Sequence, residues 1–213
     1  MDWANPLAPI VSGLDAVVLD RLYRVTGSQS AGEVHRRGGK GSPSGIRFAL
    51  ERLADQGLVT SRGIGNIRAY ELNTAHLTYL AVQAVLDAYR PYELLRERIR
   101  DLVVEHFGDD ARSVAIFGSV ARREAGTSSD VDLLVVTAPG GRDDEDDEVE
   151  LVSVLHHEVE RWTGNQVQIV EVTREQLVTT LRAGDPFAAS LRLEVDTVVG
   201  QDIRSFLNQA VHR

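Results

Sequence analysis

The sequence predicts a two-domain protein of the α/β (α+β) class: an N-terminal unit of helices with a hairpin, a helical connector, and a C-terminal mixed sheet flanked by helices. Two observations carry this prediction. From Ser113 onward the pattern changes from helices to strands alternating with helices. Charge is also divided, because residues 26–70 carry seven Lys/Arg against three Asp/Glu, whereas residues 139–160 carry one Arg against nine Asp/Glu. We therefore expect domains at 1–74, 75–107 and 108–213.

The composition is that of an ordinary globular protein, with 43% hydrophobic and 26% charged residues. A chain of 213 residues can bury two small cores. It has no cysteine, which excludes thiolate metal sites and agrees with a cytoplasmic location. No apolar run approaches the roughly 20 residues that span a bilayer, and residues 1–10 lack the pattern of a signal peptide. We expect a cytoplasmic protein with no membrane partner.

The first domain is predicted to contain three helices and a hairpin. Residues 11–24 have apolar residues at helical spacing, and Ser30-Ala-Gly-Glu is a capping-box pattern that begins a second helix. Ser42 followed by proline begins a third helix, which ends near Gly57. Two short strands then surround a turn rich in glycine and asparagine, at 58–60 and 69–72.

This layout resembles the winged helix-turn-helix family over about residues 10–73, most closely in the Leu-Glu-Arg-Leu-Ala-Asp-Gln-Gly-Leu-Val stretch at 50–59. The resemblance implies binding to double-stranded DNA, with the third helix in the major groove and the hairpin on phosphate or the minor groove. It also suggests a homodimer. Arg47 is the candidate for reading a base edge. The implied DNA-binding residues are Lys40, Ser42, Ser44, Arg47, Arg62 and Arg68. Two alternatives stay open, that these are solvated surface charges and that the domain docks a protein.

A helical connector is expected next. Thr74 is a candidate cap for a helix to about Ala88, and Pro91 begins another that ends near Phe107. The one-sided apolar stripes of both helices predict packing on a neighbouring domain or on a dimer partner. Beyond the connector, strands are expected at 113–117, 131–137 and 166–172. Helices are expected at 149–162, from Thr173, and from Asp185-Pro186.

The chemistry is concentrated between residues 117 and 136. Gly118-Ser119 follows a buried strand, where a tight turn can present backbone amides and a hydroxyl to phosphate oxygens. Asp130 and Asp132 stand two apart at the start of the next strand, so period-two alternation places both carboxylates on one face. Two adjacent carboxylates repel each other unless a hard cation such as Mg²⁺ neutralises them.

This arrangement resembles the nucleotidyltransferase superfamily related to DNA polymerase β, and within it the small bacterial minimal nucleotidyltransferases, over residues 108–172. The resemblance implies that Gly118, Ser119, Arg122 and Ser129 bind a nucleoside triphosphate. It also implies that Asp130 and Asp132 bind Mg²⁺ or Mn²⁺ and are the catalytic residues. The reaction would transfer a nucleoside monophosphate to a hydroxyl of a protein, an RNA or a small molecule.

The sequence departs from that family at the third metal-binding position. The superfamily usually supplies a carboxylate from a later strand, and here Val-Gln-Ile-Val presents Gln168. A neutral amide binds a metal weakly and cannot act as a general base. Three functions therefore stay open. The chain transfers a nucleotide, it senses one in order to regulate transcription, or it is an inactive regulator or toxin–antitoxin component that acts through protein interaction.

Overall fold

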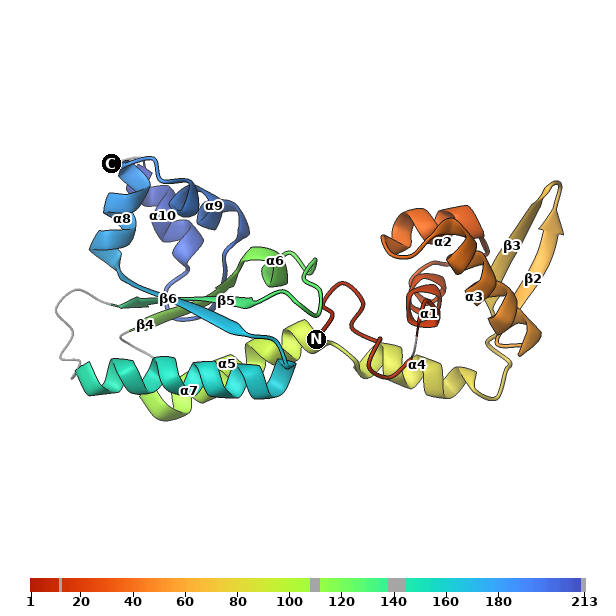
Figure 1. Ribbon diagram of the computed structural model, residues 1–213, viewed down its shortest axis with the longest axis horizontal. Helices are drawn as coiled ribbons and strands as arrows, with labels where there is room; N and C mark the ends of the chain where they lie inside the picture. The colour runs from red at the N-terminus through yellow and green to blue at the C-terminus, as the bar shows by residue number, and fades with distance from the viewer. Residues whose placement is uncertain (12, 108–111, 138–144, 212–213) are drawn as a thin grey trace. The chain divides into compact units, whose positions relative to one another are not determined.

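The computed structural model describes residues 1–11, 13–107, 112–137 and 145–211 (Figure 1). The chain forms two compact units, one of Asn5–Arg90 and one of Met1–Ala4 with Pro91–Arg213. The stretch 75–107, expected as a connector, is divided between the two units. Within the described ranges, no helix is both long enough and apolar enough to cross a membrane.

The Asn5–Arg90 unit packs helices against a three-stranded antiparallel sheet with strand order β1-β3-β2. Its elements are α1 (Asp15–Tyr23), β1 (Gln29–Ser30), α2 (Ala31–Gly38), α3 (Pro43–Asp55), β2 (Val59–Ile64), β3 (Ile67–Leu72) and α4 (Tyr79–Ala88). One buried cluster joins the helices to the sheet, and it includes Leu19, Leu22, Val34, Ile46, Leu50, Leu53, Val59, Tyr70 and Leu72.

The two predicted helix starts in this unit are confirmed. The Ser30 Oγ accepts a hydrogen bond from the Glu33 amide at 3.3 Å, and the Glu33 Oε2 accepts one from the Ser30 amide at 2.8 Å. Ser42 caps α3 by accepting from the Gly45 amide at 3.1 Å, with Pro43 in the first turn. Both caps satisfy amides that a helix start leaves unpaired.

The hairpin is longer than predicted, because the strands run to Ile64 and from Ile67 rather than stopping at the polar residues between them. The connection is only Gly65-Asn66, and Gly65 has a φ of +58°, the conformation that a two-residue hairpin loop needs at its first position. The sequence predicts a turn over these polar residues, whereas in the structure most of them lie in a two-stranded ribbon and are exposed.

The predicted start of the next helix at Thr74 is wrong, because α4 begins at Tyr79. The preceding residue, Asn73, forms a turn instead. Its side chain donates to the Gly57 carbonyl at 2.9 Å and accepts from the Ala75 amide at 3.2 Å. An asparagine that binds nearby backbone in this way competes with helix formation.

The second unit contains a mixed sheet with strand order β6-β5-β4-β7, in which β5 and β6 are parallel and the other neighbours antiparallel. This mixed sheet flanked by helices was the predicted class. The elements are α5 (Pro91–Phe107), β4 (Arg112–Phe117), α6 (Gly118–Ala121), β5 (Val131–Thr137), α7 (Glu145–Thr163), β6 (Val167–Thr173), α8 (Arg174–Arg182), α9 (Pro186–Glu194), β7 (Asp196–Val199) and α10 (Ile203–Val211).

Helices cover both faces of this sheet (Figure 1). Alternate residues of each strand divide between the two layers. Ile116 and Leu133 pack with α5 and α7, whereas their chain neighbours Ala115 and Leu134 pack with α8, α9 and α10. The sheet is therefore buried on both sides, and its strands consist of nearly continuous apolar runs.

No element was predicted for residues 196–211, where the structure has β7 and α10. The strand is four residues long and includes Asp196 and Thr197, so its sequence carries little strand signal. Its place in the sheet comes from pairing with β4 and from α5, where the Tyr92 hydroxyl donates to Asp196 at 2.6 Å and Arg96 donates to the Thr197 carbonyl at 3.1 Å.

Asn165, between α7 and β6, forms hydrogen bonds with the loop that precedes β5. Its side chain is 3% exposed, and Nδ2 donates to the Ser129 carbonyl at 2.9 Å. The same nitrogen lies 3.3 Å from the Gly126 carbonyl and 3.4 Å from that of Thr127. Through these partly buried contacts, Asn165 holds the loop that leads into β5.

We predict that Asn165→Ala destabilises the second unit by about 2 kcal/mol, because the substitution removes a buried amide that donates to the carbonyls of the 126–129 loop. The measurement is urea unfolding of the full chain followed by tryptophan fluorescence. Both tryptophans, Trp3 and Trp162, belong to this unit, so the signal reports on it alone.

The matched control is Asn208→Ala. Asn208 is an exposed asparagine whose Oδ1 accepts from Arg192 at 3.1 Å, and its loss should change stability by less than about 0.5 kcal/mol. Equal effects of the two substitutions would contradict the role assigned to Asn165.

Candidate functional site

The candidate site lies where β4 ends and β5 begins. Phe117, Asp132 and Gln168 are paired in one row across β4, β5 and β6. Residues paired in register point to the same face of a sheet. Phe117 packs edge-on against Phe187 of α9, with ring centroids 5.6 Å apart. Asp132 and Gln168 therefore face the layer of α8, α9 and α10.

Gly118 is required at the turn between β4 and α6 for two reasons. Its φ of +68° is a conformation that other residues rarely adopt. In addition, a Cβ placed on Gly118 would collide with Oδ2 of Asp132. The turn can approach the carboxylate only because residue 118 has no side chain.

The structure brings the two carboxylates and Gln168 together. The Gln168 Nε2 donates to Oδ2 of Asp130 at 2.6 Å. Burial raises the pKa of the Asp132 carboxyl above its usual range, and the charge of Asp130 raises it further. The charge of Arg122 acts on the same pKa in the opposite direction. The site therefore concentrates negative charge in a partly desolvated place.

Arg122, at the end of α6, is shared between two glutamates. Its Nε donates to Oε2 of Glu124 at 2.8 Å, and Nη1 forms an ion pair with Glu194 at the end of α9. These two contacts use Nε and Nη1, and a guanidinium has further N–H groups that a phosphate could contact. The sequence does not predict the contact with Glu194, because the two residues are far apart in the chain and Glu194 belongs to no motif.

The turn after α6 is held by its own backbone and by Ser129. The Ser119 carbonyl accepts from the Glu124 amide at 2.9 Å and from the Ala125 amide at 3.2 Å. The Ser129 Oγ accepts from the Gly126 amide at 3.0 Å. Ser129, predicted to bind nucleotide, here closes the turn that leads to Asp130.

The donor set fits one hard cation. Two carboxylates supply anionic oxygens, and the Gln168 amide supplies a neutral oxygen or a hydrogen-bond donor. In the part of the chain that the structure describes, no three His, Asp or Glu side chains gather in an arrangement that could hold a metal ion. Position 168 thus lacks the anionic ligand that a second metal would need.

The predicted DNA-binding residues lie on α3 and on the hairpin. Ser42 and Ser44 have their hydroxyls 3.1 Å apart at the start of α3. Arg47 follows on the exposed side, with its guanidinium 5.8 Å from the centre of the Phe48 ring and Nε 3.9 Å from Glu51. Residues Arg62 and Arg68 lie on β2 and β3, and Lys40 on the loop before α3.

Three exposed apolar side chains in the same unit were not singled out from the sequence. Phe48 is 63% exposed, Ile64 54% and Ile67 59%. Helical and strand periodicity mark the residues that enter a core, and these three do not. Their exposure is known only from the structure.

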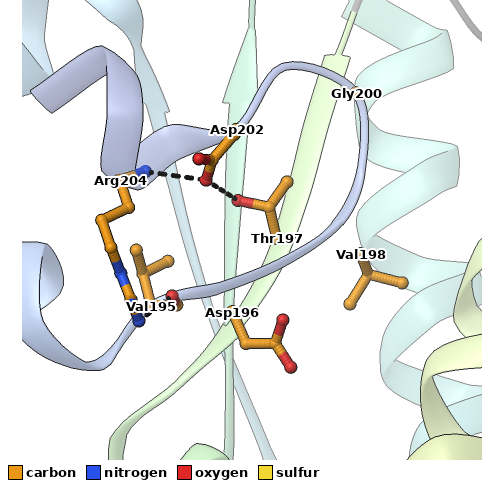
Figure 2. A pocket seen from close by; sticks show the side chains of 7 residues that line it. All are labelled: Val195, Asp196, Thr197, Val198, Gly200, Asp202 and Arg204. Carbon is orange, nitrogen blue, oxygen red and sulfur yellow. Dashed lines mark hydrogen bonds between the residues drawn. The ribbon is translucent and has the colours of Figure 1, made fainter.

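A recess of about 340 Å³ lies beside β7 and the start of α10 (Figure 2). Its polar groups are paired with one another. Asp202 accepts from the Arg204 amide at 3.2 Å and from the Thr197 hydroxyl at 3.4 Å, and the Arg204 guanidinium donates to the Val195 carbonyl at 2.8 Å. The recess is thus accounted for by the contacts that hold the β7–α10 turn.

No curated protein matches the chain. Six chains of solved structures are similar to this one. A mutant of the toxin–antitoxin MntA-HpeT is 14% identical with a TM-score of 0.37, covering 55% of this chain and 84% of that one. A toxin–antitoxin with AMP-PNP is 15% identical with a TM-score of 0.36 and the same coverage. Residues 97–183, which include Gly118, both aspartates and Gln168, match the model of the family Polymerase beta, Nucleotidyltransferase.

Proposed function

We propose that the second unit binds a nucleoside triphosphate together with one divalent cation, Mg²⁺ or Mn²⁺, and that the Asn5–Arg90 unit binds double-stranded DNA. The proposed nucleotide and cation site is supported mainly by the close surroundings of the Asp132 carboxylate. Its carboxylate faces Asp130, is partly desolvated, and touches the space left free by Gly118. A cation relieves that repulsion, and a triphosphate brings the remaining oxygens that a hard cation needs.

The residues around the aspartates suit the phosphates. The Gly118–Ser119 turn lies beside Asp132 and presents backbone amides and a hydroxyl. Arg122 carries a cation whose charge already acts on Asp132. We propose that phosphate oxygens exchange with the carboxylates of Glu124 and Glu194 on this guanidinium.

Gln168 is the residue that favours nucleotide sensing over nucleoside monophosphate transfer. A bound Mg²⁺ stabilises negative charge on phosphate and orients the chain of phosphates. Attack by an acceptor hydroxyl on a protein, RNA or small molecule also requires a group that takes its proton, and the Gln168 amide cannot do so. We therefore propose nucleotide sensing as the main role, with nucleoside monophosphate transfer as the reaction class that the same site would support.

DNA binding is supported by the charge and the layout of the first unit. Residues 26–70 carry a net charge of +4, from seven Lys/Arg and three Asp/Glu, although the chain as a whole is at −9. Ser44 and Arg47 face solvent on the first turns of α3, where a recognition helix contacts DNA. A homodimer would place two such helices on two half-sites. If nucleotide changes the affinity for DNA, then DNA must change the affinity for nucleotide by the same factor.

The toxin–antitoxin alternative stays a prediction. A gene for a small helical protein beside this one, and a complex of the two products, would favour it over sensing.

The decisive experiment is calorimetric titration of ATP, GTP, CTP and UTP in the presence of Mg²⁺. Wild type should bind one nucleotide per chain. Asp130→Asn and Asp132→Asn should each weaken binding at least about 100-fold, because each removes an anionic ligand of the cation. Asp101→Asn, on the exposed side of α5, is the control and should bind as wild type.

A second pair of variants tests the close approach of the Gly118 backbone to the Asp132 carboxylate. Gly118→Ala places a Cβ against Asp132 and should abolish binding, whereas Gly126→Ala meets no atom within 4 Å and should not. Wild type that binds no nucleotide with Mg²⁺ or with Mn²⁺ would refute the proposed site.

We predict that Gln168→Glu increases the number of bound Mn²⁺ ions from one to two per chain. A third carboxylate would repel Asp130, so the metal-free variant should unfold at a lower temperature and recover when Mn²⁺ is added. The measurements are Mn²⁺ titration by electron paramagnetic resonance and thermal unfolding. Gln201→Glu, an exposed glutamine, is the control. A count of one ion in both variants would show that position 168 does not limit the metal content.

We predict that wild type binds a duplex selected from genomic fragments, and that binding weakens steeply with salt because phosphate contacts release counterions. Arg47→Gln should weaken binding to the selected site by about 10–100-fold and relax its sequence preference. Arg24→Gln removes the same charge from the residue after α1, where Arg24 pairs with Asp20 at 2.7 Å, and should have a small effect. A salt-insensitive interaction, or equal effects of the two substitutions, would speak against this DNA surface.

A further inference from the structure

The Met1–Ala4 segment belongs to the second unit, whereas Asn5–Arg90 form the first. The polypeptide therefore passes from one unit to the other at two places, after Ala4 and after Arg90. The segment is held in the second unit by a buried side chain, since Trp3 is 5% exposed and joins the core around β4 and β5. Burial of this large aromatic ring stabilises the docked position of the segment.

The segment lies against the turn that follows α6. The backbone amides of Trp3 and Ala4 both donate to the Ala125 carbonyl, at 2.8 and 3.2 Å. The Ala125 amide in turn donates to the Ser119 carbonyl at 3.2 Å. Ala125 is 1% exposed and packs in the same core as Trp3. Two hydrogen-bonded steps thus connect the segment with Ser119, which stands in the proposed phosphate-binding turn.

A second set of contacts leads to the aspartates. The Asn165 side-chain amide donates to the Met1 carbonyl at 3.2 Å and to the Ser129 carbonyl at 2.9 Å. Ser129 directly precedes Asp130 in the chain. The segment is therefore connected to both sides of the proposed site, the turn at 118–122 and the start of β5.

The other connection between the units meets the same turn. Tyr92, in the first turn of α5, packs edge-on against the Trp3 ring, with centroids 6.5 Å apart. The Arg123 guanidinium lies 4.9 Å from the centre of the Tyr92 ring and donates to Glu93 at 2.9 Å. These contacts join the Met1–Ala4 segment, the start of α5 and the turn after α6 in one aromatic cluster.

Two features of this cluster oppose docking of the segment. The indole Nε1 of Trp3 is buried and has no hydrogen-bond partner among the described residues, which reduces the free energy gained by burying the ring. Arg123 has a φ of +61°, a conformation that costs free energy in a residue other than glycine. A ligand that favours the docked position can therefore shift the balance between docked and released segment.

We propose that the Met1–Ala4 segment couples the nucleotide site to the linkage between the two units, because bound nucleotide and the docked segment stabilise each other. This inference rests on the proposed nucleotide binding by the second unit. While the segment is docked, the turn at 118–122 is already ordered, so phosphates bind it at a lower cost in conformational entropy. By linkage, nucleotide favours docking by the same factor. A docked segment leaves two chain connections between the units, and a released one leaves the connection after Arg90 alone.

The first test is calorimetry in the presence of Mg²⁺, with the most tightly bound of ATP, GTP, CTP and UTP. Trp3→Ala should weaken nucleotide binding about 5–20-fold, because the turn is no longer held. Trp3→Phe keeps an aromatic ring against Tyr92, lacks the unpaired indole N–H, and should bind as wild type. Leu155→Ala is the control for stability, since it leaves a cavity in the same core from α7 and should not change affinity. Circular dichroism checks that each variant is folded.

The second test follows docking itself in a Trp162→Phe background, where Trp3 is the remaining tryptophan. Acrylamide quenching of its fluorescence reports how far the ring is accessible. Nucleotide with Mg²⁺ should lower the quenching constant, and the additional substitution Asp132→Asn should remove that effect. A quenching constant that bound nucleotide does not change would overturn the coupling.

The calorimetric outcomes separate this inference from the nucleotide site. Equal affinities of wild type and Trp3→Ala would overturn the coupling and leave the site standing. Equal weakening by Trp3→Ala and Leu155→Ala would assign Trp3 to stability alone and would also overturn it. A wild-type protein that binds none of the four nucleotides would overturn both the site and the coupling.

Discussion

The site in the second unit depends on one close approach, that of the Gly118 backbone to the Asp132 carboxylate. A Cβ at residue 118 would collide with Oδ2 of Asp132. The turn, α6 and the start of β5 can pack closely because residue 118 has no side chain. Partial burial at this place raises the pKa of the Asp132 carboxyl, and the charge of Asp130 raises it further. A positive φ at the same residue means that conformation and space both demand glycine.

Asn165 supports this approach from the other side of the loop. It is buried, belongs to no recognised motif, and supplies a donor to the carbonyls that precede Asp130. Val131 is fixed at the same place, since its amide donates to the Gln166 carbonyl at 2.8 Å. The position of the aspartates thus depends on the junction of α7 and β6 as much as on the strand that carries them. Gln168 then completes the cluster through its bond to Asp130.

The parts of the fold that could be predicted are those with local causes. The caps at Ser30 and Ser42, the glycine turn at 118 and the two aspartates each follow from a few neighbouring residues. The parts that could not be predicted depend on distant partners. β7 forms because β4 and α5 supply its contacts, and the pairing of Arg122 with Glu194 joins residues that are far apart in sequence. The start of α4 was misjudged because a side chain of Asn73 satisfies backbone groups that a helix would otherwise use.

The short length of β1 has a consequence for motion in the hairpin. β1 pairs only with Tyr70 and Ala69 of β3, so the three-stranded sheet ends there and the rest is a ribbon of two strands. A pair of strands that has neither a third strand nor a face packed on other elements is only marginally stable in water. Backbone amides between Arg62 and Arg68 should exchange with solvent deuterium far sooner than those of Tyr70 and Leu72. Binding of a ligand to the outer ribbon would therefore also order it, and the loss of conformational entropy lowers the affinity. The same freedom lets one hairpin adapt to grooves of several shapes.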